Sequence, residues 1–347
     1  MELILETINN IYDHLSDDES KKIFNMRLKY LISCDEREYV TSNMMLYNDW
    51  KMIDGLRAPE IEDPLIICTA GHDGLLNKTV LSKLGYQILC YTDRLKKGTV
   101  EGIEIKSIEE AAKKYIGAKY VVGSKRFMKE IYTELIASGI SKDKIVIPRH
   151  RYITLKRGNT YFDAFKSSGD DFFVDAGANN GDTIVGFKKW CNDKFEKIMA
   201  FEPNRITYEN LVDNTKNDQR VEAYNYALWD KKETLRFSLN GAGSRVICDS
   251  NMCSGEIDSA FAVTLDSMLD KERITFIKMD IEGSELHALM GARKTIIRNK
   301  PNLAICVYHK PIDFIEIASY LLVLNPDYKI NYRNYFSNTY ETILYAY

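Results

Sequence analysis

Apolar and polar positions alternate along the chain in two different rhythms. Residues 1–58 follow a helical apolar repeat, which predicts a helical segment. In residues 59–149, short apolar runs such as LIIC and YVV alternate with amphipathic stretches. This alternation is typical of a parallel sheet covered by helices, so we expect a small Rossmann-like α/β domain there. Residues 150–347 begin with a polar connector and then resume the same rhythm, which predicts a third part with its own sheet.

The third part carries the longer series of expected elements. DFFVDAG predicts a strand, KIMAFEP and ITFIKMDIEG predict further strands, and a helix is expected over 284–299. The last two apolar runs, 328–335 and 342–347, predict an antiparallel hairpin. The glycine-containing run at 240–246 is a weak signal for a phosphate-binding loop and more simply predicts a hairpin turn. It lies between the third and fourth expected strands, in an insertion that we expect to overhang the site and shape the acceptor pocket. We therefore expect a second, larger open α/β sheet.

Composition and charge narrow the class of protein. The 347 residues include 47 basic and 50 acidic side chains, so the net charge of −3 provides no basic field for nucleic acid or an anionic membrane. The seven cysteines are scattered and form no CxxC pair, which favours reduced thiols and a cytoplasmic protein. Cys248 and Cys253 have no spacing typical of zinc ligands, even with His287 included. No apolar run is long enough for a membrane span.

The most informative motif is VDAGANNGDT at 174–183. An apolar strand ends at Asp175, and the chain then turns through a loop between Gly177 and Gly181 before a helix. Such a loop brings backbone N–H groups close to a carboxylate or other anion. Glu202 ends the next strand, where an acid accepts hydrogen bonds from both hydroxyls of a ribose. The alternative is a tight strand–helix turn in which the acid only caps a helix. The position of Glu202 at the end of the next strand favours a nucleoside-type ligand instead.

The same motif indicates which nucleoside. It lacks the GxGxxG pattern of a dinucleotide site, and Asp175 directly before the loop disfavours a polyanion. A ligand that carries an ammonium or sulfonium group suits this acid. S-adenosylmethionine has both groups, and its carboxylate suits the amides of the loop.

Two further strand ends carry ionisable side chains. In KMDIEG, Asp280 and Glu282 lie on one strand face at the carboxyl end, where open α/β sheets bind ligands. Glu285 falls in the first turn of the next helix, and we interpret it as a helix-start acid. His309 ends the following strand, where a neutral imidazole can take a proton from a substrate hydroxyl. The remaining histidines are interpreted as structural: His14, His72, His150 and His287.

The smaller domain has a weaker motif, TAGHDG. Thr69 stands where the first glycine of GxGxxG belongs, and Asp93 follows Gly71 at about the spacing of a ribose-binding acid. Two interpretations stay open: a site for a nucleotide or nucleotide-linked sugar, and a purely structural or oligomerising domain that makes the protein a homo-oligomer.

These motifs together resemble a known family. VDAGANNGDT, FEPN, NYALWD, the run from TLDSMLDKERITFIKMDIEG to SELHALMGA, and CVYHKP resemble FkbM-type S-adenosylmethionine-dependent methyltransferases over roughly residues 165–347. The resemblance implies a class I methyltransferase sheet of seven strands, the last antiparallel, and O-methylation of a hydroxyl, often on a sugar. It assigns Glu202 to the ribose. It also assigns Asp175, Gly177, Ala178, Asn179 and Gly181 to the methionine side, and Asn225 and Ala227 to the adenine.

The sequence thus predicts an S-adenosylmethionine-dependent O-methyltransferase acting on a sugar or glycan precursor, including a nucleotide-linked sugar. Asp280 and His309 are the base candidates, with Glu282 in support; alternatively, Asp280 and a neighbour hold a divalent metal ion that acidifies the hydroxyl. Two other classes compete with this prediction. One is an NAD-dependent oxidoreductase with tandem Rossmann units, and the other is a non-catalytic nucleotide-binding scaffold.

Overall fold

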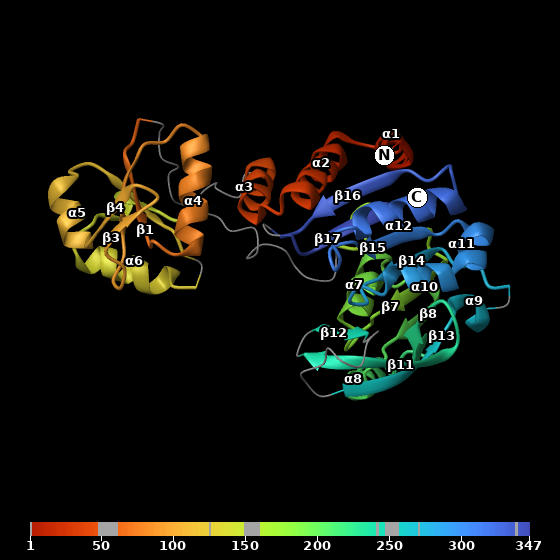
Figure 1. Ribbon diagram of the computed structural model, residues 1–347. Coiled ribbons are helices and arrows are strands. Elements are labelled where there is room, and N and C mark those ends of the chain that lie inside the picture. The colour runs from red at the N-terminus through yellow and green to blue at the C-terminus, as the bar shows by residue number, and fades with distance from the viewer. Residues whose placement is uncertain are drawn as a thin grey trace. The chain divides into compact units, whose positions relative to one another are not determined.

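The computed structural model describes residues 2–47, 62–124, 126–148, 160–240, 243–246, 257–269, 271–336 and 339–347. Its contacts divide the chain into two compact units (Figure 1). The larger unit comprises 1–31, 156–335 and 340–347, and the smaller unit comprises 32–155 and 336–339. The predicted boundaries after residues 58 and 149 both touch stretches outside the described residues, so the three-part division stays a prediction. No helix in the described part of the chain is long and apolar enough to cross a membrane.

The predicted helical segment forms three helices as far as it is described: α1 (Glu2–Asp13), α2 (Asp18–Ser33) and α3 (Glu36–Tyr47). The first residues of the chain lie along the edge of the larger unit's main sheet. Ile330 donates its backbone N–H to the carbonyl of His14 and accepts one from Ser16. The ring of Phe24 packs edge-on against Phe314 at 5.4 Å between centroids. Residues 1–31 are therefore part of the larger unit, whereas α3 belongs to the smaller unit.

The smaller unit holds a six-stranded sheet in the order β3-β4-β2-β1-β5-β6. The neighbours in this sheet are parallel except for β3 and β4, a hairpin that the apolar pattern did not predict. Its turn places Glu101 and Gly102 at φ 49° and 75°. The strands are β1 (Leu65–Cys68), β2 (Ile88–Thr92), β3 (Gly98–Val100), β4 (Ile103–Lys106), β5 (Lys119–Val122) and β6 (Ile145–Val146); the helices are α4 (His72–Lys83), α5 (Ile108–Lys114), α6 (Met128–Ala137) and the 3₁₀ turn η1 (Lys142–Lys144).

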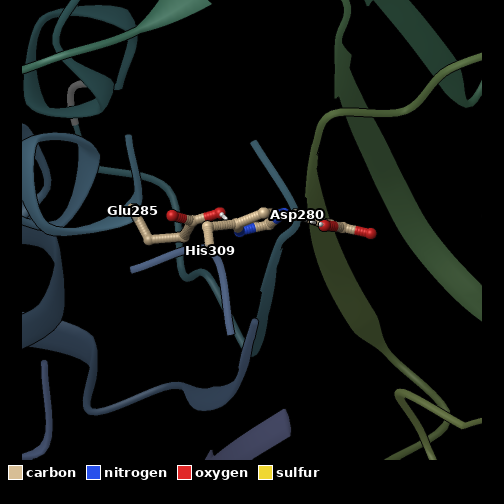
Figure 2. Close-up of side chains that lie close together, drawn as sticks. All are labelled: Asp280, Glu285 and His309. Carbon is tan, nitrogen blue, oxygen red and sulfur yellow. Dashed lines mark ion pairs between the residues drawn. The ribbon is translucent and has the colours of Figure 1, made fainter. Parts of the chain in front are cut away.

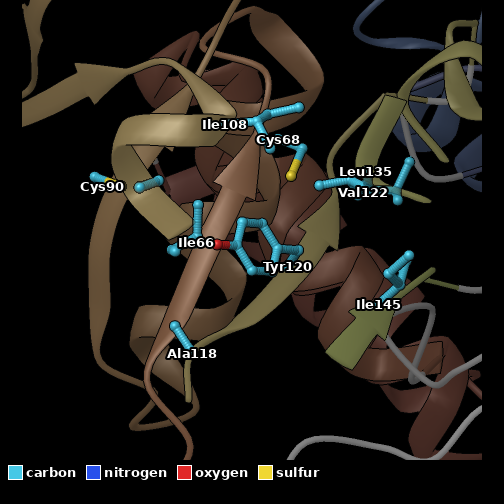
Figure 3. Close-up of a cluster of buried hydrophobic side chains, with 10 residues drawn as sticks. Ile66, Cys68, Cys90, Ile108, Ala118, Tyr120, Val122, Leu135 and Ile145 are labelled. Atoms are coloured by element: carbon cyan, nitrogen blue, oxygen red, sulfur yellow. The ribbon is translucent and has the colours of Figure 1, made fainter. Parts of the chain in front are cut away.

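Alternate residues of these strands point to opposite faces of the sheet, as the period of two requires. Ile66 and Cys68 join Tyr120 on one face, where α5 contributes Ile108 and α6 contributes Leu135 (Figure 3). The residues between them, such as Ile67 and Val121, face the other side together with residues of α4. Both faces of the sheet are therefore apolar and covered, as predicted for a Rossmann-like domain.

The main sheet of the larger unit has seven strands in the order β16-β17-β15-β14-β7-β8-β9. β17 runs antiparallel to both of its neighbours, so the terminal hairpin is confirmed. This order, with the last strand reversed, is the one expected of a class I methyltransferase sheet. The strands are β7 (Asp171–Ala176), β8 (Phe195–Phe201), β9 (Val221–Tyr224), β14 (Phe276–Met279), β15 (Asn302–Cys306), β16 (Ile330–Asn334) and β17 (Thr342–Ala346).

Helices connect these strands, and one prediction about them is wrong. The single helix expected over 284–299 is divided at Ala292 into two helices, and Gly291, the last residue of the first, packs against the carbonyl of Trp229. A Cβ at Gly291 would stand 1.9 Å from that oxygen. The helices are α7 (Asp182–Trp190), α8 (Arg205–Thr215), α9 (Leu265–Met268), α10 (Glu285–Gly291), α11 (Arg293–Asn299) and α12 (Asp313–Leu324).

The insertion after β9 forms a second sheet of the larger unit in the order β10-β13-β11-β12. Its strands are β10 (Ala227–Leu228), β11 (Glu233–Asn240), β12 (Gly243–Val246) and β13 (Ile257–Val263). β11 and β12 pair antiparallel, which confirms the predicted hairpin, while 241–242 and 247–256 lie outside the described residues. The idea that this insertion borders the acceptor pocket stays a prediction.

An aromatic cluster forms much of the core beside β7. Phe162 lies at its centre, with ring centroids 5.7 Å from Phe173, 5.5 Å from Trp190 and 5.4 Å from Phe276. Phe162 and its neighbour Tyr161 belong to the segment that we interpreted as a polar connector. That interpretation is wrong for these two residues, because both rings are buried.

Candidate functional site

The predicted loop after β7 is packed tightly between the ends of β8 and β14. Gly177 has φ +77°, and a Cβ there would stand 2.0 Å from the carbonyl oxygen of Asp280, so only glycine fits. The N–H groups of Gly177 and Ala178 both donate to the carbonyl of Phe201 at 3.0 Å. Gly181 has φ +90° and ends the loop as the residue before α7. The loop therefore leads from the strand end to the helix N-terminus, as predicted.

Glu202 ties this loop to the end of β8. Its Oε2 accepts the N–H of Asn179 at 3.0 Å, and its Oε1 accepts the N–H of Asn204 at 2.9 Å. Burial raises the pKa of Glu202, although the hydrogen bonds from Asn204 and Asn179 oppose this shift. Each carboxylate oxygen retains a second lone pair, which suits the two hydroxyls of a ribose.

The predicted adenine-side residues lie nearby. The side-chain amide of Asn225 donates to the carbonyls of Glu202 and Pro203, at 3.0 Å each. Ala227 begins β10 and pairs with Ala262 of β13. Hydrogen bonds thus connect Asn179, Glu202 and Asn225 in one series. Their roles in binding a cofactor stay predictions that the arrangement fits.

Asp175 has a partner that the sequence interpretation missed. The strand register sets Lys278 directly beside it, and the ammonium Nζ lies 3.1 Å from Oδ1 of Asp175. Both side chains are buried. Nζ also donates to the carbonyls of Ala176 and Gly177, at 3.1 Å and 2.7 Å. Burial disfavours the ammonium form of Lys278, but the charges of Asp175 and Asp280 outweigh it and raise the lysine pKa. Lys278 therefore stabilises the point at which the strand becomes the loop.

Asp280 follows β14 and is held by backbone and side-chain contacts. Its N–H donates to the carbonyl of Ala176 at 3.1 Å. The hydroxyls of Tyr161 and Tyr308 donate to its two carboxylate oxygens, at 2.9 Å and 3.3 Å. Burial by itself raises the pKa of Asp280, but the charges of Lys278 and His309 and the Tyr161 hydrogen bond lower it overall. Neither tyrosine was among the predicted site residues.

His309 lies between carboxylates at the end of β15 (Figure 2). Its Nδ1 is 3.0 Å from Oε1 of Glu285, and its Nε2 is 3.5 Å from Asp280 and 3.5 Å from Glu282. Burial lowers the pKa of His309, but the contact with Glu285 and the charges of Asp280 and Glu282 raise it overall. The structure therefore brings together Asp280, Glu282 and His309, as predicted.

Glu285 has more contacts than the helix-start interpretation implies. It lies in the first turn of α10 as predicted, yet its side chain is completely buried. Its Oε1 accepts the N–H of Ile281 at 2.9 Å and faces the imidazole. The turn before it places Glu282 at φ 58° and Gly283 at φ 92°, which reverses the chain directly beside His309. No helix-start signal in the sequence distinguishes an exposed acid from this buried one.

The weaker motif of the smaller unit has a different arrangement. Thr69 adopts φ 127°, a conformation that strongly favours glycine. Oδ2 of Asp93 accepts the N–H of Ala70, while Oδ1 accepts the N–H groups of Leu95 and Lys96, all at 2.9 Å to 3.0 Å. Asp93 therefore ties together the loops after β1 and β2. Glu202 is held in the same way in the larger unit, so this geometry does not decide between the two interpretations of the smaller domain.

Comparisons with known proteins address the larger unit. Residues 175–336 match the family model of the methyltransferase FkbM domain, which confirms the predicted resemblance over these residues. No curated protein matches the sequence.

Three solved structures that are similar to this chain have low sequence identity to it. The FkbM methyltransferase of Methylobacillus flagellatus KT has 20% identity and a TM-score of 0.49, with 91% of this chain and 100% of that chain covered. A putative rRNA methylase from Clostridium thermocellum has 10% identity and a TM-score of 0.37, with 56% and 96% covered. A putative methyltransferase from Streptococcus mutans, in complex with SAH, has 12% identity and a TM-score of 0.34, with 56% and 99% covered. Because these TM-scores are below 0.5, we infer nothing about the function of this chain from these structures.

Proposed function

Because residues 175–336 form a methyltransferase FkbM domain, we propose that the protein is an S-adenosylmethionine-dependent O-methyltransferase that acts on a hydroxyl of a sugar or glycan precursor. One observation carries this proposal: the predicted cofactor loop and the predicted catalytic side chains lie side by side. Asp280 contacts the loop through its backbone at Gly177 and Ala176, while its side chain belongs to the cluster around His309. The proposed cofactor loop and the proposed proton-accepting cluster therefore meet at Asp280.

The residues of the loop fit the proposed cofactor. Glycine at 177 and 181 keeps the loop close to the strand ends, and the N-terminus of α7 suits a carboxylate. Glu202, held by two backbone N–H groups, presents its remaining lone pairs to a ribose. S-adenosylmethionine supplies a methyl group that its sulfonium already activates.

The chain's own contribution is alignment of the acceptor and removal of its proton. As the acceptor oxygen forms its bond to the methyl carbon, the carbon–sulfur bond breaks and the hydroxyl proton must leave. The contacts of His309 with Asp280 and Glu282 support a role of this cluster in accepting that proton. They serve either as proton acceptors or as ligands of a metal ion that acidifies the hydroxyl.

Other functions receive less support. An NAD-dependent oxidoreductase would use the TAGHDG loop, but Thr69 stands there in place of the first glycine of the GxGxxG pattern. A scaffold would not need the cluster around His309. The net charge of −3 supports a small-molecule or glycan acceptor, including a nucleotide-linked sugar, over a nucleic acid.

The proposal is tested with purified protein, methyl-labelled S-adenosylmethionine and a panel of sugars, nucleotide-linked sugars and glycan fragments. We expect label transfer to one acceptor class, with a mass gain of one methylene unit on an oxygen as shown by fragmentation. Calorimetry with S-adenosylhomocysteine, NAD and NADP is run in parallel. Binding of NAD without binding of S-adenosylhomocysteine would contradict the proposal, and label on nitrogen or carbon would contradict its O-methyl part.

A further inference from the structure

The side chains around His309 leave buried polar atoms without hydrogen bonds. Among the described residues, Nε2 of His309 and Oε2 of Glu285 make no hydrogen bond, and Nδ1 of His309 contacts Oε1 of Glu285 as an ion pair without hydrogen-bond geometry. The His309 side chain is only 4% exposed and that of Glu285 is 0% exposed. Such atoms are costly to leave unpaired, by about 1–3 kcal/mol each. The cluster is therefore incomplete without a further group.

The distances around Nε2 indicate what that group is. Asp280 and Glu282 each lie 3.5 Å from Nε2, which is longer than an ordinary N–H···O hydrogen bond. Two ligand atoms on one metal ion, with bonds of about 2.0–2.2 Å at angles of about 90–110°, lie roughly 2.9–3.5 Å apart. The spacing thus fits atoms that share an ion better than atoms that share a proton.

The other side of the ring supports the same conclusion. A histidine that binds a metal through one nitrogen usually donates the other N–H to a carboxylate. Glu285 lies 3.0 Å from Nδ1, on the far side of the ring from Asp280 in Figure 2. The backbone N–H of Ile281 fixes the same Glu285 oxygen, so this carboxylate is held beside Nδ1. Oxygens of Asp280 and Glu285 and a ring nitrogen of His309 all lie within 4.8 Å of one another, so Glu285 lies close to the proposed ion as well as to the ring.

We propose that Nε2 of His309 and the carboxylates of Asp280 and Glu282 bind a divalent metal ion, with Glu285 as the positioning residue at Nδ1. One imidazole with carboxylates is a donor set for first-row transition ions such as Mn²⁺, Co²⁺ or Zn²⁺, whereas Ca²⁺ prefers oxygen alone. The role of the ion rests on the proposed function: an acceptor hydroxyl bound to it loses its proton more readily. The binding of the ion does not depend on that function.

The test titrates Mn²⁺ into full-length protein that has been freed of metal with a chelator, using calorimetry, and titrates S-adenosylhomocysteine separately. We expect one Mn²⁺ per chain. Asp280→Asn and His309→Gln should abolish measurable binding, and Glu285→Gln should weaken it by about 10–100-fold, as loss of an outer carboxylate does elsewhere. Glu209→Gln, on the exposed face of α8, is the matched control and should bind as the wild type does.

The metal's own spectrum distinguishes a ligand from a positioning residue. The visible spectrum of bound Co²⁺ should change in shape for Glu282→Gln, whereas Glu285→Gln should mainly lower occupancy. Wild-type protein that binds S-adenosylhomocysteine but none of Mn²⁺, Co²⁺ and Zn²⁺ would overturn the metal site and leave the proposed function intact. Metal binding that is unchanged in Asp280→Asn and His309→Gln would also overturn it. Metal binding without S-adenosylhomocysteine binding would contradict the proposed cofactor instead.

Discussion

Lys278 lies beside Asp175 across the pairing of β14 with β7, and the two form a buried ion pair with 3.1 Å between Nζ and Oδ1. The same ammonium holds the carbonyls of Ala176 and Gly177, where the strand becomes the loop. One buried pair therefore connects the stability of the sheet to the shape of the proposed cofactor site.

Replacing Lys278 by Met should destabilise the larger unit strongly. The substitution leaves Asp175 buried and unpaired, which should lower the free energy of unfolding by about 3–5 kcal/mol. Urea unfolding measures this loss. Lys300→Met is the matched control, because its partner Asp327 is exposed, and it should cost at most about 1 kcal/mol. Adding Asp175→Asn to Lys278→Met should recover part of the loss. Equal effects of Lys278→Met and Lys300→Met would show that the buried pair is not important for stability.

Glu202→Ala should weaken binding of S-adenosylhomocysteine at least about tenfold, because hydrogen bonds to a charged group contribute about 1.5–3 kcal/mol each. Calorimetry measures the affinity. Since Ala also removes the acceptor for Asn179 and Asn204, Glu202→Gln provides a milder second variant. Glu196→Ala, an exposed position on the same strand, is the control. Unchanged affinity in a folded Glu202→Ala protein would place the cofactor elsewhere.

Asp280→Asn and His309→Ala should depress methyl transfer far more than cofactor binding. Loss of a group that assists proton removal typically costs about 10²–10⁴ in rate. The affinity for S-adenosylhomocysteine should stay within a few-fold of the wild-type value, because neither side chain takes part in the hydrogen bonds that hold the loop at 177–181. Asp213→Asn, on the exposed surface of α8, should match the wild type in both assays. A double variant, Asp280→Asn with His309→Ala, that retains near wild-type turnover would exclude both residues from the reaction.

The parts of the site that sequence predicts are those with local signals. Gly177 and Gly181 mark a turn within one motif of ten residues. Glu202 and Asp280 each follow an apolar run that predicts a strand. Because parallel strands meet at one edge with their carboxyl ends, such residues come together without knowledge of their side-chain packing. The alternation of strands and helices along the sequence likewise predicts the six-stranded and the seven-stranded sheet.

The missed parts depend on contacts between distant segments. Lys278 stabilises the loop only because the strand register places it beside Asp175, about a hundred residues earlier in the chain. Its one local signal is a charge inside an apolar strand. Tyr161 reaches Asp280 from a segment whose polar composition resembles a linker. Glu285 has a sequence position that suits a helix start equally well whether it is exposed or buried. These roles are properties of packing, so no local pattern encodes them.

Residues 1–31 should be required for a stable larger unit. Phe24 is fully buried and packs on both Phe314 and Tyr332. Phe24→Ala should therefore lower the free energy of unfolding by about 3–5 kcal/mol. Leu5→Ala, at an exposed position of α1, should change it by no more than about 0.5 kcal/mol. A fragment that starts at residue 160 should be less stable than the full chain, because it leaves the edge of β16 uncovered. Equal urea midpoints for Phe24→Ala and Leu5→Ala would contradict this placement.

The contact of Asp17 with Arg333 predicts how this N-terminal packing responds to acid. Burial raises the pKa of Asp17, but the Arg333 side chain, 2.5 Å from Oδ2, and the N–H of Ser20 lower it overall. A carboxylate whose pKa is lower in the folded protein stabilises it above the unfolded pKa of about 3.9, and this stabilisation disappears as the pH falls through the folded pKa.

Melting temperatures measured between pH 7 and pH 3 test this sign. Asp17→Asn should melt below the wild type by a constant amount from about pH 7 to pH 5, and the difference should shrink below about pH 4. In the background of Arg333→Met, the same Asp17 substitution should have a smaller effect, because only the hydrogen bonds with Ser20 remain to lower the pKa. A difference between Asp17→Asn and wild type that grows toward acid would mean that Asp17 is protonated more easily in the folded protein, and the ion pair with Arg333 would not stabilise the fold.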